Sequence, residues 1–154
     1  MRYGLFRVGI LNYAIALQQI QKILQGSKGY TLPRLPGAVS AVIVDAAELI
    51  PLLDLGRMLG ENNQKELTSQ PYQILVDSEY GTVALPADSI ARIVSEKKGA
   101  LLKSPSKERI LGSVAKFVYL SEEYNILDIN FLAIEMTQGF WQSHSDSGGA
   151  GRHQ

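Results

Sequence analysis

The chain has 154 residues, of which 45% are hydrophobic, so it is long enough to form one ordinary domain with a substantial core. It contains no cysteine, which excludes disulfide bonds and thiolate metal sites and fits a reducing compartment. Fifteen basic residues balance fifteen acidic ones, so no overall charge attracts a polyanion such as nucleic acid.

Most of the chain is predicted to form short β-strands. Eight segments are rich in β-branched or aromatic residues and are bounded by turn-forming residues. They are residues 5–9, 13–17, 41–44, 49–53, 72–77, 82–85, 114–120 and 124–127. Many short strands with closely spaced turns predict an all-β barrel or sandwich.

Four short helices are expected between these strands. The first, residues 18–25, places Ile20, Ile23 and Leu24 on one helical face. Each of the others follows an aspartate that is predicted to cap its N-terminus. These helices are residues 54–60, 89–94 and 129–136, with Asp54, Asp88 and Asp128 as the caps.

The sequence also contains an internal repeat. Residues 13–17, followed by Ile20 and Ile23, resemble residues 81–85, followed by Ile90 and Ile93. A second pair of patterns follows in the same order in each half, with residues 40–42 leading to 53–55 and residues 112–114 leading to 127–129. Two recurring patterns predict a duplicated sub-barrel of about seventy residues. The junction between two such units is a natural groove for a partner helix or loop.

The two ends of the chain carry further expectations. The amino terminus has no apolar run long enough for a signal peptide, and no segment approaches the ~18 apolar residues of a membrane helix. We therefore expect a cytoplasmic protein that does not insert into a membrane. Residues 139–154 are polar and rich in Gly and Ser, which predicts a flexible tail after a domain at residues 1–138.

The sequence offers few residues for catalysis. Both histidines, His144 and His153, lie in the tail, and no phosphate-binding loop or nucleophile motif is present. We therefore expect no enzyme activity, no cofactor and no metal. An acid/base hydrolase that pairs Asp54 with Asp128 stays an alternative to their role as helix caps. A small-molecule sensor that uses the groove between the two units is a second alternative.

Positive charge is concentrated locally between residues 97 and 109. Because no aromatic residues for base stacking are interleaved with these cations, we interpret them as a solvated loop and expect no nucleic-acid partner. The cluster consists of Lys97, Lys98, Lys103, Lys107 and Arg109.

Seven short motifs, taken in order, resemble the CheW-like domain over roughly residues 3–138. They are Phe6-Arg7-Val8-Gly9, Tyr13-Ala14-Ile15, Ile20-Gln21-Lys22-Ile23, Leu32-Pro33-Arg34-Leu35-Pro36, Ile50-Pro51-Leu52-Leu53-Asp54-Leu55, Asp88-Ser89-Ile90 and Ile126-Leu127-Asp128-Ile129. The resemblance implies two five-stranded SH3-like β-barrels around a shared core. It also implies a non-catalytic adaptor that couples the cytoplasmic tips of chemoreceptors to a CheA-like histidine kinase. One barrel face would dock on the kinase regulatory domain, and the region between the barrels would take the receptor's helical hairpin.

The resemblance also suggests which residues contact partners. Six residues match family positions in or near such surfaces, namely Ile20, Lys22, Ala41, Val42, Ala46 and Ile93. For the apolar members, packing in the core is the competing interpretation, and it applies equally to Ile23 and Ile90.

The chain departs from the family pattern at a few of these positions. The family usually has a glycine at Ala41 and an Asn-Leu-Arg-Gly turn at residues 44–47, where this chain has Val-Asp-Ala-Ala. Without the glycine, this turn is expected not to adopt positive φ angles. Lys22 stands where the family often has a glutamate. We hypothesise that the chain binds a non-standard receptor or kinase, or has lost one of these partners.

Overall fold

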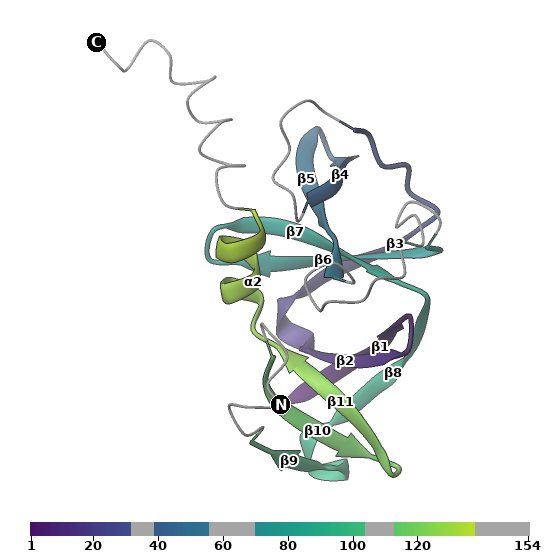
Figure 1. The fold of residues 1–154 in the computed structure, drawn as a ribbon, viewed down its shortest axis with the longest axis vertical. Coiled ribbons are helices and arrows are strands. Elements are labelled where there is room, and N and C mark those ends of the chain that lie inside the picture. Colours follow the sequence, from purple (N-terminus) through teal and green to yellow (C-terminus); the bar gives the residue numbers. More distant parts are fainter. Residues whose placement is uncertain (32–38, 56–69, 104–112, 138–154) are drawn as a thin grey trace, which may run out of the picture.

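The computed structural model describes residues 1–31, 39–55, 70–103 and 113–137 (Figure 1). The predicted tail, the residues 56–60 of the second expected helix, and Lys107 and Arg109 of the basic cluster lie outside the described residues. Within these ranges the chain forms eleven strands, two 3₁₀ turns and an α-helix. They are β1 (Arg2–Val8), β2 (Leu11–Ala16), η1 (Leu17–Gln19), β3 (Ile20–Gln25), β4 (Val39–Asp45), β5 (Glu48–Leu53), β6 (Tyr72–Ser78), β7 (Gly81–Ala87), β8 (Ser89–Ser95), η3 (Glu96–Lys98), β9 (Ala100–Leu102), β10 (Ser113–Tyr119), β11 (Glu122–Leu127) and α2 (Ile129–Met136).

All eight predicted strands are confirmed, and the fold is mostly β as expected. Two of the predicted helices are wrong, because residues 20–25 and 89–95 form the strands β3 and β8. Both strands contain a bulge, which falls at Gln21 in β3 and at Ala91 in β8. A bulge sets two residues opposite one, so that residues three apart share a face and imitate helical spacing.

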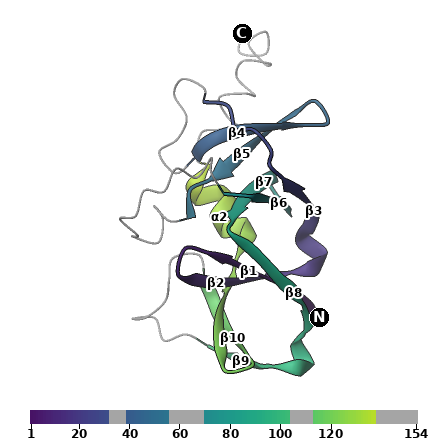
Figure 2. The same cartoon turned by 90° about the vertical axis from the view of Figure 1, so that its right-hand side faces the viewer.

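The strands form two sheets. Sheet A has the order β8-β1-β2-β11-β10-β9, and sheet B has the order β3-β6-β7-β5-β4. Figures 1 and 2 show sheet B in the upper part of the molecule and sheet A in the lower part. In sheet B the two edges approach each other, because Tyr30, just after β3, pairs with Val42 of β4. This pairing curls the sheet toward a closed barrel.

The predicted repeat is present in the strand order. Sheet A without β9 and sheet B have the same order if β1, β2, β8, β10 and β11 correspond to β6, β7, β3, β4 and β5. Each half of the chain therefore contributes strands to both sheets. The prediction that each half forms its own sub-barrel is wrong, since β3, β4 and β5 of the first half complete the sheet of the second half.

The register of the repeat also differs from the sequence alignment. The equivalent hairpins turn between Val8 and Leu11 and between Ser78 and Gly81, which makes Leu11 the counterpart of Gly81. The sequence comparison pairs Tyr13 with Gly81, two residues away. The later pairing of residues 53–55 with 127–129 agrees with the structure, since Leu53 faces Val39 and Leu127 faces Ser113 at equivalent positions.

The largest cluster of buried apolar side chains lies between the sheets. It unites residues of both halves with the buried face of α2, including Phe6, Tyr13, Leu53, Leu85 and Leu132. Smaller clusters fill each sheet's own interior. Because the halves share one core, they are expected to unfold together.

The β4–β5 turn contradicts the expectation of negative φ angles. Ala46 and Ala47 have φ values of 49° and 65°, and Leu120 and Ser121 repeat this geometry in the β10–β11 turn, with 50° and 66°. The strands on both sides pair up to the turn, leaving two residues to reverse the chain. A two-residue hairpin with right-handed strand twist requires positive φ at both positions, so strand pairing overrides the preference of alanine.

The three aspartates predicted as helix caps differ in the interactions that the structure shows for them. Asp128 caps α2 as expected, because its Oδ1 accepts a hydrogen bond from the Phe131 N–H at 3.1 Å. The prediction for Asp88 is wrong, since its carboxylate accepts hydrogen bonds from the Gly9 N–H at 2.5 Å and from the Gln70 amide at 3.0 Å. Most of the helix predicted after Asp54, residues 56–60, lies outside the described residues, so this cap is not tested.

Candidate functional site

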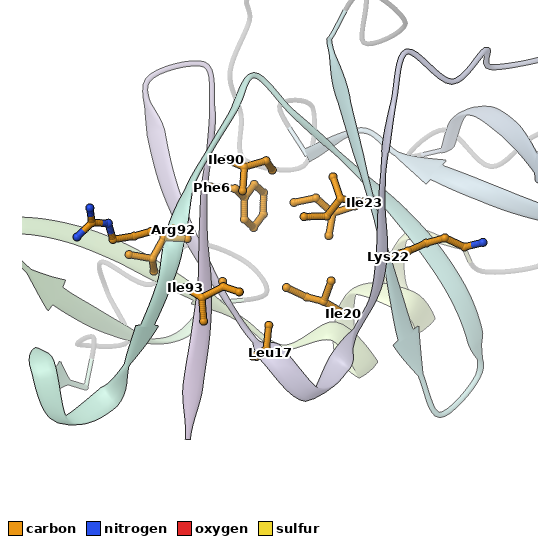
Figure 3. Close-up of a pocket in the computed structure, with 11 residues that line it drawn as sticks. Phe6, Leu17, Ile20, Lys22, Ile23, Ile90, Arg92 and Ile93 are labelled. Atoms are coloured by element: carbon orange, nitrogen blue, oxygen red, sulfur yellow. The ribbon is translucent and has the colours of Figure 1, made fainter.

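An apolar groove of about 470 Å³ lies between β3 and β8 (Figure 3). The two strands belong to different sheets, so the groove lies between the two barrels. Strands β1 and β6, which pair with β8 and β3, and the turn η1 complete it. Its lining residues are Gly4, Leu5, Phe6, Leu17, Ile20, Lys22, Ile23, Ile74, Ile90, Arg92 and Ile93.

The two long walls of the groove are built from equivalent residues of the repeat. On β3, Ile20 pairs with Val76 and Lys22 pairs with Leu75 on either side of the bulge. On β8, the corresponding partners are Ile90 with Phe6 and Arg92 with Leu5. Ile23 and Ile93 are the next equivalent residues along the two strands. Each wall therefore presents an isoleucine, a cation and a second isoleucine in the same order.

The isoleucines divide the groove into a floor and two rims. Ile20 and Ile90 are half-buried and pack against the central core. Ile23 and Ile93 are 45% and 57% exposed, which is unusual for two isoleucines that flank the same groove. Figure 3 shows these side chains gathered from the two facing strands. The surface is suited to an apolar partner.

The charged residues of the groove stand at its edges. In Figure 3 the Lys22 and Arg92 side chains extend outward from opposite walls. The Lys22 ammonium lies 2.7 Å from the Asp45 carboxylate, at the end of β4. Arg92 instead donates a hydrogen bond to the Tyr119 hydroxyl at 3.0 Å. Of the lining residues that the structure describes, only these two are charged.

One lining residue leaves space for its neighbour. A Cβ atom on Gly4 would lie 2.7 Å from Cδ1 of Ile20. The counterpart of Gly4 in the repeat is Ile74, since these residues pair with Ile93 and Ile23. On the β1 side of the groove, the end of the Ile20 side chain therefore fills the space that a larger residue at position 4 would take.

The structure brings three of the six predicted partner-binding residues together. Ile20, Lys22 and Ile93 line the groove. Ala41 and Val42 are each 1% exposed, so their side chains belong to the core. Ala46 is exposed in the β4–β5 turn, next to Asp45, whose carboxylate forms an ion pair with Lys22. Whether these residues bind partners stays a prediction.

Sequence reasoning missed Arg92, although the internal repeat already pointed to it. The comparison of Ile20 and Ile23 with Ile90 and Ile93 places Arg92 opposite Lys22 in the alignment. For Ile90 the sequence did not decide between packing in the core and contact with a partner. The structure shows that its side chain packs against the core and also lines the groove.

The described residues contain no group of three or more His, Cys, Asp or Glu side chains that could hold a metal ion. None of their helices is long and apolar enough to cross a membrane. The Asp128 carboxylate, which the hydrolase alternative would use, bonds to the backbone of its own helix.

Comparison with known families decides the assignment. A family model of the CheW-like domain matches residues 2–133, which is most of the chain. The chain belongs to the CheW-like family. Among solved structures, it is similar to the scaffolding protein TtCheW from Thermoanaerobacter tengcongensis, with a TM-score of 0.74 and 15% sequence identity. That match covers 85% of this chain and 90% of TtCheW. No curated protein matches the sequence significantly.

The comparisons confirm the expected fold class, in which each sheet corresponds to one SH3-like subdomain of the CheW-like fold. Sheet A has six strands instead of the expected five because β9, which the sequence did not predict, joins its edge. Membership of the family supports a role as an adaptor or scaffold in chemotaxis signalling.

Proposed function

We propose that this CheW-like chain is a non-catalytic cytoplasmic adaptor that couples chemoreceptor tips to a CheA-like histidine kinase. The family match supports the adaptor role. The groove between the barrels carries the more specific part of the proposal, because it offers a continuous apolar surface at the place where the family resemblance expects the receptor hairpin. The kinase regulatory domain would dock on a barrel face outside the groove.

The groove can take a helix between its two apolar walls. Its walls present side chains, with Ile23 and Ile93 partly exposed on either side. An α-helix satisfies its own backbone hydrogen bonds, so it can insert an apolar stripe between such walls. Burial of these two side chains would then supply a large part of the binding free energy.

We further propose that the recognition surface differs from the usual one. Lys22 and Ala46 are both departures from the family pattern, and the ion pair between Lys22 and Asp45 supports a link between them. Asp45 directly precedes Ala46, so the two departures form one continuous patch. A partner whose charges complement the usual family residues would meet a lysine at position 22 in place of glutamate. It would also find no arginine at position 46.

Calorimetric titration tests the adaptor proposal. The chain should bind the receptor hairpin and the kinase regulatory domain of its own organism with a Kd of about 1 μM or tighter. An Ile93→Glu variant should lose the hairpin and keep the kinase domain. Leu101→Glu is the matched control, since Leu101 is 51% exposed on β9 and does not line the groove. Failure of the unmodified chain to bind either partner would refute the adaptor role.

A second titration tests the altered surface. Partners from a system with the usual family residues should bind this chain weakly. Restoring the usual residues with Val44→Asn, Asp45→Leu, Ala46→Arg, Ala47→Gly and Lys22→Glu should strengthen that binding. If the unmodified chain already binds both standard partners at micromolar concentration, the recognition surface is not altered.

The sensor alternative has one observation in its favour, because the groove volume falls within the range of small-molecule pockets. The lining residues within the described ranges offer apolar side chains and two outward-pointing cations, without the convergent polar groups that orient a small ligand. Saturable binding of a metabolite that competes with the receptor hairpin would favour this alternative.

A further inference from the structure

The two cations at the groove are equivalent in the repeat but differ in their surroundings. Lys22 follows the bulge of β3 and pairs with Leu75, as Arg92 follows the bulge of β8 and pairs with Leu5. A helix in the groove would therefore have one cation along each side.

Only one of these cations has its charge balanced within the described residues. The Lys22 ammonium is held by Asp45 at 2.7 Å. Arg92 is exposed and bonds to the neutral hydroxyl of Tyr119, and none of the ion pairs between described residues includes it. In Figure 3 the Arg92 side chain extends outward from its wall, so the Tyr119 contact holds the guanidinium at the outer rim of the groove. Most of its five N–H donors have no hydrogen bond within the described residues and stay open to a partner.

We propose that the groove binds an amphipathic helix whose apolar stripe is flanked by acidic residues, and that Arg92 selects and orients this helix. This inference rests on the proposed function, because the helix is taken to be one of the receptor hairpin. A carboxylate beside the apolar stripe gains a charged hydrogen-bonding partner at Arg92. At the opposite rim, Asp45 already occupies Lys22, so the more acidic side of the helix faces β8.

The effect of Arg92 should be one of specificity more than of total affinity. Burial of Ile23 and Ile93 is the same for any helix with a suitable apolar stripe. An exposed ion pair changes affinity by about two- to fivefold, and a repulsive contact has a similar effect in the opposite direction. The order of affinities for differently charged helices is therefore the informative quantity.

Three designed helical hairpins serve as probes, each with the same apolar stripe and with Glu, Gln or Lys beside it. We expect the chain to bind the Glu hairpin most tightly and the Lys hairpin most weakly, with about two- to fivefold between successive probes. The differences should shrink at about 1 M salt, because screening weakens exposed charge pairs.

Variants of the chain separate the two cations. Arg92→Gln should remove most of the preference for the Glu hairpin, and Arg92→Glu should reverse it. Asp45→Asn should increase the preference, since it releases Lys22. Lys103→Gln removes one exposed positive charge outside the groove lining and should leave the order unchanged.

Two results would overturn the inference. One is equal binding of all three hairpins, and the other is a preference for Glu that survives Arg92→Gln. Failure to bind any designed hairpin while the natural receptor hairpin still binds would also overturn it and would leave the adaptor role intact. Failure to bind both the natural hairpin and the kinase domain would instead refute the proposed function.

Discussion

The Cδ1 atom of Ile20 occupies space beside Gly4 that any larger residue would need, at 2.7 Å from the position of a Cβ atom. Gly4→Ala should therefore push the end of the Ile20 side chain into the groove. Because this end is flexible, the free energy of unfolding should change by less than about 1 kcal/mol, whereas the affinity for the receptor hairpin should fall. Chemical unfolding and calorimetry measure the two quantities.

The matched control for Gly4→Ala is the double variant with Ile20→Val. Valine lacks the Cδ1 atom, so the new methyl group fits and hairpin binding should recover. Equal binding by Gly4→Ala and the unmodified chain would show that the groove does not depend on this contact.

The β4–β5 turn should be easy to stabilise. Ala46 and Ala47 adopt positive φ angles, which cost alanine about 1 kcal/mol and glycine much less. Ala47→Gly should therefore raise the free energy of unfolding by about 1 kcal/mol, as measured in urea. Ala100→Gly is the control, since β9 is an extended strand in which glycine destabilises by roughly 0.5–1 kcal/mol. A similar loss for both variants would mean that the turn is not strained.

The Asp128 cap should matter for the stability of the whole domain, because α2 carries the fully buried Leu132 and Ala133 into the central core. Asp128→Ala removes the acceptor for the Phe131 N–H and should lower the free energy of unfolding by about 1 kcal/mol. Asp128→Ser keeps a capping oxygen and should retain most of the stability. If both variants lose the same amount, the carboxylate acts in some way other than capping.

Stability should also fall at high pH because of two tyrosines. Burial raises the pKa of Tyr3 and of Tyr124 above the ordinary value of 10.0, and the nearby Glu96 and Glu122 carboxylates act in the same direction. The folded state thus holds these protons more strongly than the unfolded state. Their contribution is complete below pH 10 and is lost as pH rises through the raised pKa values.

Urea unfolding between pH 8 and pH 11 measures this effect. Tyr3→Phe should flatten the alkaline decline, since phenylalanine has no proton to lose. An unchanged decline in both Tyr3→Phe and Tyr124→Phe would assign it to other groups.

The strands that pair within one hairpin could be predicted from local sequence. Segments such as 72–77 and 124–127 carry enough β-branched and aromatic residues between turns to identify them. The strands β3 and β8 could not, because each contains a bulge that changes the spacing of its isoleucines. Their partners β6 and β1 lie about fifty and ninety residues away in the sequence, and that distant pairing decides between strand and helix.

The candidate site was predictable only where its residues could be identified from local sequence. Ile20, Lys22 and Ile93 could be proposed from the resemblance, and the repeat could have added Arg92. The burial of Ala41 and Val42 could not be predicted, since the identity of an apolar residue on a strand does not tell which face of the sheet its side chain occupies. The positive φ angles of Ala46 and Ala47 follow from strand pairing and oppose the local preference of alanine.

The sequence by itself determined the all-β class, the duplication, the cap at Asp128 and the resemblance to the CheW-like family, because these depend on local patterns of residue type. Only the tertiary structure decided that the two halves exchange strands, that β3 and β8 face each other across a groove, and that Lys22 has a carboxylate partner while Arg92 bonds to a hydroxyl. These relationships join residues far apart in the chain, and they exist only once hydrogen bonding between distant strands has fixed the register and the face of each side chain.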